Sequence, residues 1–407
     1  MHKLLLLGTV FLVTNSLFSQ GFQVNFQGQK QQGMGGAGNA LPLDAASVFF
    51  NPGSVAFLKE NSVNIAFTPT FANTLFEDAN TTSIGRTNSP MGTPFSAYAV
   101  YRKNENSKFF YGLGIYTPFG STIQYEDGWT GRFALTKLQL KSIFFQPTIS
   151  YKLNDKIGFG AGFVYSTGNV NLQKDIPVQD ANGTYGHAEL NGKASGFGFN
   201  VGLFVQATEK LNLGVSYRSQ VNMAVAEGTA TFTVPSSLAT NFPNGTFSSA
   251  LPLPQVATLG LAYKLNEKWA FALDVNYVGW KAYDTLSFDY AQNTTSLVDT
   301  KSARNYKNTF AFRFGTNYSI STNWDARIGL AYGITPVQSG YVTPETPDAN
   351  RVNYTAGLGY KMGEHFQLDA SIFFTHLKRT DTNLETNLSG TFTTNVIAPG
   401  LAIIYKF

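Results

Sequence analysis

The chain of 407 residues lacks cysteine, is poor in charge, and has no long apolar run beyond its first residues. Without cysteine it can form no disulfide, no thiolate metal site and no cysteine nucleophile. Charged residues make up 13% of the chain, whereas an ordinary soluble domain has roughly 25%. A soluble protein needs charge on its surface to stay dispersed. The composition therefore disfavours an ordinary soluble fold.

The scarcity of basic and histidine residues excludes further classes of function. The net charge is only +4 and no basic cluster is present, so a nucleic-acid partner is not expected. Histidine occurs only four times and never at a metal-ligand spacing, so we expect neither a metal nor another cofactor. A barrel-embedded hydrolase would need an outward Ser–His pair. Ser371 lies an odd number of residues from His376, hence on the opposite strand face, and no enzyme is expected.

What the chain does contain points to a membrane β-barrel. Aromatic residues reach 14%, with 35 Phe and 20 Tyr, and there are 39 Gly. The mean hydropathy is nevertheless −0.09. A chain that is rich in aromatics and glycine, poor in charge and neutral in hydropathy is typical of a transmembrane β-barrel, because its strands alternate lipid-facing and lumen-facing residues.

The amino terminus has the pattern of an export signal. Met1–Lys3 is a short positive region, Leu4–Phe18 is almost continuously apolar, and Ser19 is a small residue at which cleavage is expected. The alternative is a membrane anchor, but the run is shorter than the ~20 residues that a spanning helix needs. An exported chain without a spanning helix can enter a membrane only as a closed barrel.

Alternation and turns predict the number of strands. Apolar and polar residues alternate with period two, for example along Leu211–Tyr217, Trp324–Ile334 and Phe366–Phe374. Six short polar turns separated by longer polar connections match the periplasmic turns and outer loops of outer-membrane barrels. With a first strand near Asn61–Phe76 and a last one near Thr391–Phe407, the sequence predicts an all-β fold, a 14-stranded antiparallel transmembrane barrel. The six turns are Tyr101–Phe109, Tyr151–Ile157, Val205–Leu211, Tyr263–Trp269, Tyr318–Trp324 and Tyr360–Phe366.

Residues before the first strand do not alternate. Gly21–Lys59 contains a run of small residues, Gly33–Ala40, and a turn signal, Asn51-Pro52-Gly53. A flexible linker is the simple alternative, but Val48–Phe50 and its neighbours are too apolar for a solvated linker. We therefore predict three parts: a signal peptide over 1–19, a plug or hatch with short helices inside the lumen over 20–60, and the barrel over 61–407.

Several motifs together resemble the FadL/TodX-type family of outer-membrane transporters for long-chain fatty acids and hydrocarbons. The family pattern usually has Asn-Pro-Ala in the hatch, where this chain has Gly53 in the third place. The resemblance spans nearly the whole mature chain. It rests on Gly33–Ala40, Asp44–Ser47, Asn51-Pro52, Tyr111–Gly120, Trp129–Arg132, Leu253–Val256, Val278–Trp280, Ala331–Ile334 and Pro347-Asp348.

The resemblance implies a mechanism. Members are monomeric barrels closed by the hatch; an apolar ligand is captured outside, enters the barrel and leaves sideways where the third strand kinks inward. That strand is Phe109–Gly120 here, and Pro118 cannot donate a ladder hydrogen bond. We expect the wall opening at Pro118, Phe119 and Gly120. The alternative is that the strand simply ends at Pro118.

Ligand-contacting residues follow from the same resemblance. The third and fourth outer loops, predicted at Lys174–Ala194 and Thr229–Pro254, would form an apolar access groove. Apolar residues on the otherwise polar inner face are candidates for ligand contacts, or else pack against the hatch. The capture candidates are Leu238, Phe242, Phe247, Leu251 and Leu253, and the lumen candidates are Phe144, Val278, Trp280 and Phe373.

The expected function is uptake of long-chain fatty acids or similar hydrophobic molecules across the outer membrane of a Gram-negative bacterium. Import of small aromatic hydrocarbons is the alternative within the family. A structural or adhesive barrel is the alternative from another class, but it leaves the apolar plug unexplained. Expected partners are the hydrophobic ligand, outer-membrane lipid with lipopolysaccharide, and the barrel-assembly machinery, which recognises an aromatic-ended last strand such as the one ending at Phe407.

Overall fold

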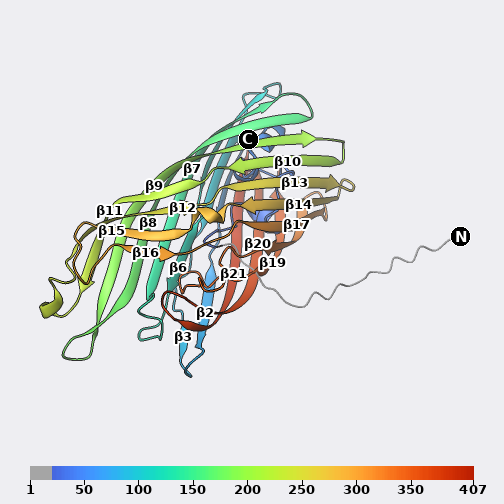
Figure 1. Cartoon of the computed structure of the whole chain (residues 1–407). Coiled ribbons are helices and arrows are strands. Elements are labelled where there is room, and N and C mark those ends of the chain that lie inside the picture. The colour runs from blue at the N-terminus through green and yellow to red at the C-terminus, as the bar shows by residue number, and fades with distance from the viewer. Residues whose placement is uncertain (1–20) are drawn as a thin grey trace.

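The computed structural model describes residues 21–407, so the expected signal peptide over 1–19 lies outside the described residues. Fourteen antiparallel strands form a closed ring, because the first pairs with the last through Ser62 opposite Lys406 (Figure 1). The predicted strand count is confirmed. In ring order the strands are β1 (Ser62–Phe67), β4 (Phe95–Tyr101), β5 (Phe109–Tyr116), β7 (Lys137–Lys152), β8 (Ile157–Gln179), β9 (Tyr185–Gln206), β10 (Leu211–Arg218), β13 (Val256–Lys264), β14 (Trp269–Val278), β17 (Thr309–Ser319), β18 (Trp324–Gly333), β19 (Arg351–Met362), β20 (Phe366–Thr382) and β21 (Ser389–Lys406).

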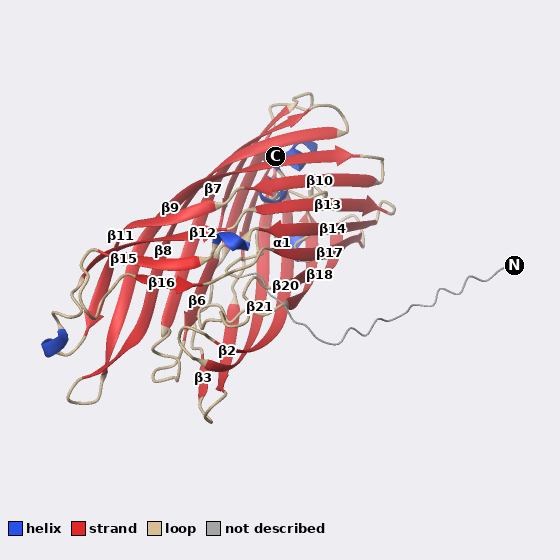
Figure 2. Cartoon of the chain, viewed as in Figure 1, coloured by secondary structure: helices blue, strands red, loops and turns tan. Residues whose placement is uncertain are grey.

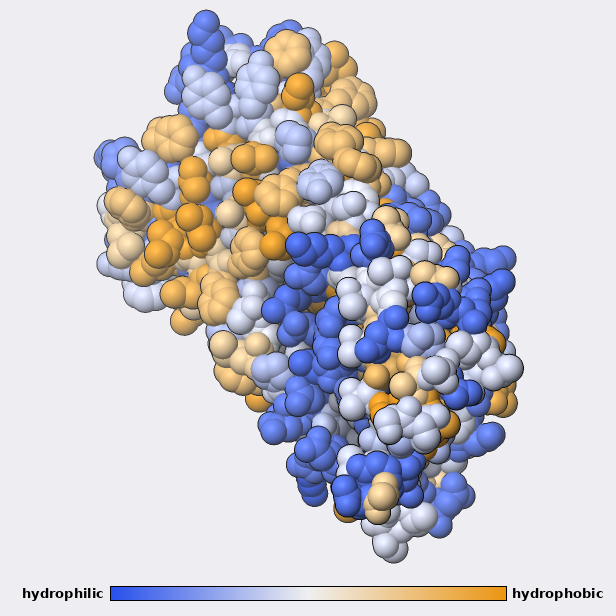
Figure 3. Space-filling model, turned by 90° about the vertical axis from the view of Figure 1, so that its left-hand side faces the viewer, coloured by the Kyte–Doolittle hydropathy of each residue, from blue (hydrophilic) through white to orange (hydrophobic). Residues whose placement is uncertain are grey.

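The alternation observed in the sequence has the polarity of a membrane barrel. On β18, Ile328 and Leu330 are 62% and 47% exposed, whereas Asp325 and Arg327 between the outward positions are 5% and 4% exposed. Apolar side chains therefore point outward and charged ones point into the lumen. All six predicted turns join neighbouring strands of the ring. Figure 3 shows apolar side chains over one half of the molecule and mostly polar side chains over the other half.

Seven further strands and two short 3-10 helices lie between ring strands. Figure 1 shows β8 and β9 running far beyond the ring on one side, accompanied by β11, β12, β15 and β16. These additional elements are β2 (Phe71–Asp78), β3 (Ile84–Arg86), β6 (Gly120–Gln124), β11 (Val221–Thr233), β12 (Gly245–Leu253), β15 (Thr285–Tyr290), β16 (Thr300–Ala303), η2 (Ser236–Leu238) and η3 (Trp280–Ala282).

The prediction that two segments form outer loops is wrong, because both segments consist largely of strands. Lys174–Ala194 is not a loop, because β8 continues to Gln179 and β9 starts at Tyr185. Thr229–Pro254 likewise contains the end of β11 and all of β12. These segments pair with one another beyond the ring, so their backbone groups are satisfied by sheet hydrogen bonds rather than by water.

Residues 21–58, which precede the first strand, fold inside the ring. They form three short helices, α1 (Gln29–Gln32), α2 (Ser47–Phe50) and η1 (Pro52–Phe57), which Figure 2 shows enclosed by strands. Nearly all side chains from Phe26 to Ala56 are buried. Among the described residues no helix is long and apolar enough to cross a membrane.

Candidate ligand cavity, wall opening and hatch

A cavity of about 550 Å³ lies between the amino-terminal segment and the ring. Most of its lining is apolar, including Phe119, Phe373 and Leu377. Volumes of roughly 300–1,000 Å³ are usual for sites that bind small organic molecules. Its lining comes from the amino-terminal segment Gly21–Phe26, from Ser89–Phe95, from Phe119–Ile123 and Gln139–Ile143 on neighbouring strands, and from Glu345–Asp348 with Arg351.

The third ring strand is interrupted beside this cavity. β5 ends at Tyr116 and β6 begins at Gly120, yet both pair with β7, so the strand continues after a displaced segment of three residues. Pro118 and Phe119 turn inward, and Phe119 is only 3% exposed. The interruption follows from Pro118, which has no N–H for the ladder.

The amino-terminal segment takes the place of the missing ladder partner. The N–H of Val24 donates to the carbonyl oxygen of Pro118 at 2.9 Å, and the N–H of Gly120 donates to the carbonyl oxygen of Phe22 at 3.2 Å. The segment thus hydrogen-bonds to the displaced part of the third strand from inside the barrel.

The displaced segment leaves the wall unpaired on its other side. The ladder between β4 and β5 ends at Ser96 opposite Tyr116, and backbone pairing resumes only at the bridge between Thr87 and Tyr125. The hydroxyls of Thr117 and Ser89 hydrogen-bond to the backbone of Phe95 and Gln124 at the two ends of this gap. Between these points, Ser89–Pro94 and Phe119–Ile123 both line the cavity. The wall is therefore discontinuous at the place where the cavity reaches it.

A buried acid holds the start of the amino-terminal segment. The N–H of Gly21 donates to Asp348 Oδ2 at 3.1 Å, and the hydroxyl of Thr335 donates to the same oxygen at 2.8 Å. Asp348 lies in the connection between β18 and β19, outside the spanning strands, and burial raises the pKa of its carboxyl to about 6. Gly21 also packs on the ring of Trp280, where a Cβ would come within 2.7 Å.

Arg351 is a functional candidate that sequence reasoning missed. It follows the Pro347-Asp348 motif, lines the cavity, and its buried Nε has no hydrogen-bond partner within residues 21–407. The carboxyl of Asp348 lies close enough to interact electrostatically with the guanidinium, but a buried nitrogen without a hydrogen bond is still costly. An anionic group in the cavity would satisfy it. The signal available in the sequence was an arginine close to an acidic motif, which is too common to indicate a site.

The four predicted lumen residues do not form one site. Phe373 lines the cavity and contacts Phe26 of the amino-terminal segment, with ring centroids 5.1 Å apart. Phe144 and Trp280 instead flank Phe119, at centroid distances of 6.2 and 6.3 Å. Val278 is buried but is not part of the cavity lining. Only Phe373 therefore meets both the hatch and the cavity.

The predicted hatch turn is anchored to the ring. Asn51 Oδ1 accepts from the N–H of Gly53 at 2.9 Å, while its Nδ2 donates to the carbonyl oxygens of Asn39 and Leu203 at 2.9 and 3.0 Å. A Cβ on Gly53 would lie 2.7 Å from two backbone oxygens of the ring. The glycine that departs from the family pattern thus permits closer approach to the wall. The carbonyl of Pro52 accepts from the hydroxyl of Ser150 at 2.7 Å.

Glycines of the ring form a socket for the hatch. A Cβ on Gly202 would lie 2.1 Å from Asn51 Oδ1, and one on Gly329 would lie 2.1 Å from the backbone of Met34. Cβ atoms essentially never approach that closely, so only glycine allows the hatch to rest directly on the strands. The glycines of this socket are Gly158, Gly160, Gly202, Gly214, Gly260, Gly315, Gly329 and Gly357.

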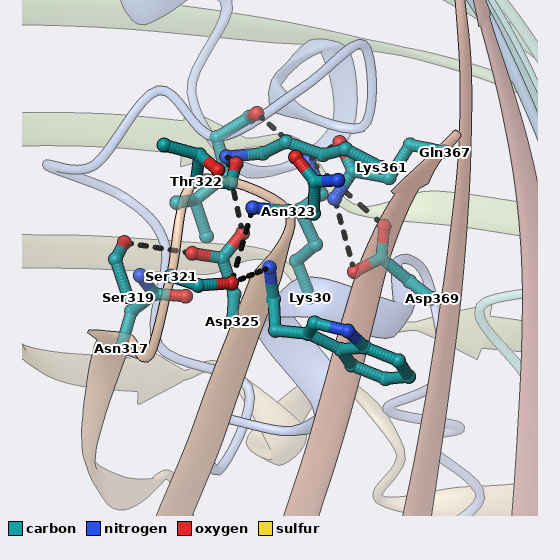
Figure 4. Close-up of polar contacts among 12 residues, drawn as sticks. Lys30, Asn317, Ser319, Ser321, Thr322, Asn323, Asp325, Lys361, Gln367 and Asp369 are labelled. Atoms are coloured by element: carbon teal, nitrogen blue, oxygen red, sulfur yellow. Dashed lines mark hydrogen bonds and ion pairs between the residues drawn. The ribbon is translucent and has the colours of Figure 1, made fainter. Parts of the chain in front are cut away.

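Charges hold α1 to the inner wall (Figure 4). Lys30 Nζ lies 3.9 Å from Asp44 and 3.9 Å from Asp369, and it donates to Gln367 Oε1 at 3.3 Å. Asp369 also accepts from Arg327 Nη1 at 2.6 Å. Each of these charges is buried, and Lys30 and Asp369 each have two oppositely charged neighbours. Within the described residues, removal of Lys30 would leave Asp44 without an ion pair, and an uncompensated buried charge costs about 3–5 kcal/mol.

The five predicted capture residues are only partly brought together. Phe247 and Leu253 are buried in the main apolar cluster, against which Phe242 and Leu251 pack. Leu238 lies on η2 and is not a member of this cluster. The same cluster reaches Phe119 and Phe144 beside the interrupted strand. Apolar packing thus extends from the outer extension, which comprises the ends of β8 and β9 beyond the ring together with β11, β12, β15 and β16, to the residues beside the cavity.

Comparisons with known proteins agree with this architecture. Residues 10–407 match the family model described as outer membrane protein transport protein (OMPP1/FadL/TodX). A long-chain fatty acid transport protein of Escherichia coli is 22% identical, with 90% of each chain covered, and an outer membrane protein of Neisseria meningitidis is 27% identical, covering 94% of this chain and 91% of that protein.

Solved structures show the same fold. A FadL homologue of Pseudomonas aeruginosa superposes with a TM-score of 0.82 at 19% identity, covering 95% of this chain and all of that one. The toluene transporter TodX of P. putida gives a TM-score of 0.74 at 17% identity, covering 93% and 98%. Because the family model spans the ring, the hatch and the interrupted strand alike, the chain belongs to the OMPP1/FadL/TodX family of outer-membrane transport proteins.

Proposed function

We propose that the protein takes up long-chain fatty acids or similar hydrophobic molecules across the outer membrane. The observation that carries the proposal is the apolar cavity of about 550 Å³ that meets the ring where its wall is unpaired. Relatives in the family include both fatty-acid and toluene transporters. A family of transport proteins also fits the expectation that the chain is not an enzyme.

The proposed route has three stages. Ligand is captured on the apolar outer extension, where Phe242, Phe247, Leu251 and Leu253 lie, with Leu238 at its tip. It then enters the cavity past the amino-terminal segment. It leaves sideways into the membrane between Ser89–Pro94 and Pro118–Ile123. The hatch, residues 20–60, closes the lumen beneath the cavity and stays in its socket throughout.

Long-chain fatty acids are favoured over small aromatic hydrocarbons by the side chain of Arg351. A neutral hydrocarbon would leave its Nε without a partner, whereas a carboxylate would accept from it. The direct test is to extract the purified protein with organic solvent and identify what copurifies by mass spectrometry. Fatty acids support the proposal. An extract that contains only aromatic hydrocarbons would favour the alternative. If cells are fed with fatty acids or with aromatic hydrocarbons and the extract contains no hydrophobic molecule, the result would oppose both functions.

The substitution Arg351→Leu should separate the two ligand classes. Loss of a charge-assisted hydrogen bond, worth about 1.5–3 kcal/mol, should weaken palmitate binding roughly tenfold to a hundredfold and leave toluene binding unchanged. Both affinities can be measured with radiolabelled ligands on purified protein. An equal loss for both ligands would mean that Arg351 only supports the cavity wall, and an unchanged palmitate affinity would remove it as an anchor.

We also propose that the chain acts as a monomer and is assembled by the barrel-assembly machinery through its last strand. Phe407 is 55% exposed, and its N–H donates to the carbonyl oxygen of Asn61 at 3.1 Å across the closing strand pair. Deletion of Phe407 should lower the outer-membrane yield at least threefold, because the strand loses its terminal aromatic residue. The yield is measured by immunoblotting of membrane fractions, with Phe366→Ala, which removes an exposed aromatic from the neighbouring strand, as control. Equal yields of the wild type and the deletion would show that the assembly signal lies elsewhere.

A further inference from the structure

Two lysines face outward in one row across β7, β8 and β9. Lys141 on β7 lies opposite Asn169 on β8, which in turn lies opposite Lys193 on β9. All three side chains are exposed. In the part of the chain that the structure describes, neither lysine forms an ion pair. Their separation is two strand spacings, or about 10 Å.

An aromatic row lies on the periplasmic side of the lysines on the same three strands, separated from them by the row Ile143, Thr167 and Ser195. Phe145 lies opposite Tyr165, and Tyr165 lies opposite Phe197, with ring centroids 6.2 and 5.3 Å apart. Each aromatic residue is four positions nearer to the periplasmic turns than the residue of the lysine row on its strand, or about 13 Å along the strand. Aromatic rows mark the membrane interfaces of barrels, so the ammonium groups lie at the level of lipid headgroups.

Amide side chains cover the surface beyond the lysines. Gln139, Asn171 and Asn191 form the next row outward. Asn171 donates to Glu189 Oε1 at 2.7 Å and accepts from Gln173 Nε2 at 2.9 Å. Glu189 is therefore occupied by amides of its own row and the next rather than by either lysine. The exposed Glu227 lies in the irregular stretch of β11 that faces Lys193, but within the described residues it forms no ion pair with that lysine. Amides offer both donors and acceptors, as a sugar requires.

We propose that this outer face of β7–β9 binds a phosphorylated glycolipid of the outer leaflet, namely lipopolysaccharide. Phosphates meet Lys141 and Lys193, sugar hydroxyls meet the amides, and acyl chains lie on the aromatic row. The three kinds of side chain occur in the same order as the three parts of the lipid. Lys141 also lines the mouth of the cavity, so the bound headgroup lies beside the wall opening.

The test compares lipid A binding to the full protein in detergent, measured by native mass spectrometry. A basic residue at a membrane surface contributes about 1 kcal/mol to binding of anionic lipid. Lys141→Gln with Lys193→Gln should therefore weaken lipid A binding about thirtyfold. Lys141→Arg with Lys193→Arg keeps the charge and should bind as the wild type does. Lipid A without phosphates should bind the wild type and the glutamine variant equally weakly.

Lys264→Gln with Lys268→Gln is the matched control. Both residues are exposed at the opposite end of the barrel, where Lys264 ends β13 and Lys268 immediately precedes β14. This variant should bind lipid A normally. Each variant is checked for a folded barrel by its heat-dependent mobility on gels. Equal lipid A affinity of the wild type and the Lys141/Lys193 glutamine variant would overturn the proposal, as would unchanged affinity after the phosphates are removed.

Discussion

A variant whose wall is closed, Pro118→Thr with Gly120→Val, should still bind ligand but lose at least nine tenths of its uptake. The introduced threonine supplies the N–H that Pro118 lacks, and the introduced valine favours an extended strand. A Cβ at Gly120 meets only the carbonyl oxygen of Leu140, at 3.2 Å, so a small shift accommodates it. Binding is measured on purified protein and uptake in cells.

The expected loss of uptake is large because transfer of the ligand from the cavity into water costs much free energy. Transfer of each buried CH₂ to water is opposed by about 0.8 kcal/mol, so a long acyl chain faces on the order of 10 kcal/mol. An exit at lipid depth avoids that cost, which is why closing the wall should block release. Pro147→Thr is the matched control, since Pro147 lies on the exposed face of β7, away from the interruption. Undiminished uptake by the closed-wall variant would exclude exit at this strand.

Substitution of a socket glycine should release the hatch and make the barrel leak. With Gly202→Val, the new side chain would overlap Asn51 Oδ1, where a Cβ alone comes within 2.1 Å. The same Cβ would lie 2.9 Å from the backbone nitrogen of Gly53 and from Pro52 Cδ. Rotation of the Asn51 side chain alone therefore does not relieve the overlap, and the hatch turn must leave the wall. We expect ion conductance in planar bilayers to rise at least tenfold over the wild type, while the ring still folds, because its strand ladders do not depend on the hatch.

Two controls bear on this expectation. Gly245→Val introduces the same side chain on β12, where a Cβ meets nothing within 4 Å, and it should leave conductance unchanged. Asn51→Ala with Pro52→Ala should also displace the hatch, but through substitutions in the hatch turn rather than in the ring. It removes three hydrogen bonds of the Asn51 side chain, worth about 1 kcal/mol each, and it should also lower ligand uptake. A wild-type conductance in a folded Gly202→Val protein would show that the socket does not hold the hatch.

The ring itself could be predicted because its causes are local. Alternation from Trp324 to Gly333 sets the two faces of β18, and short polar turns such as Tyr263–Trp269 set where strands end. The outer extension was misjudged for a physical reason. Lys174–Ala194 is polar on its exposed face like a loop, but the paired strands carry that polarity outside the membrane, where water replaces lipid.

The site depends on contacts between distant segments, which a single sequence does not reveal. Pro118 indicated an interruption, but nothing near it indicated that Phe22 and Val24, far away in the chain, would pair with the displaced strand. Gly202 is one of 39 glycines, and its role appears only when Asn51 lies against it. Arg351 likewise acquires significance only from the cavity around its unpartnered nitrogen.

Sideways exit beside the interrupted strand can be tested with a photoactivatable fatty acid that is illuminated during uptake. Peptide mass analysis then shows where the ligand was when it reacted. With sideways exit, labels should appear on both edges of the wall opening, Ser89–Pro94 and Pro118–Ile123, and none on the periplasmic side of the hatch. Labels around Lys30 and Asp369, with the edges of the opening unlabelled, would contradict it and place the path through the hatch.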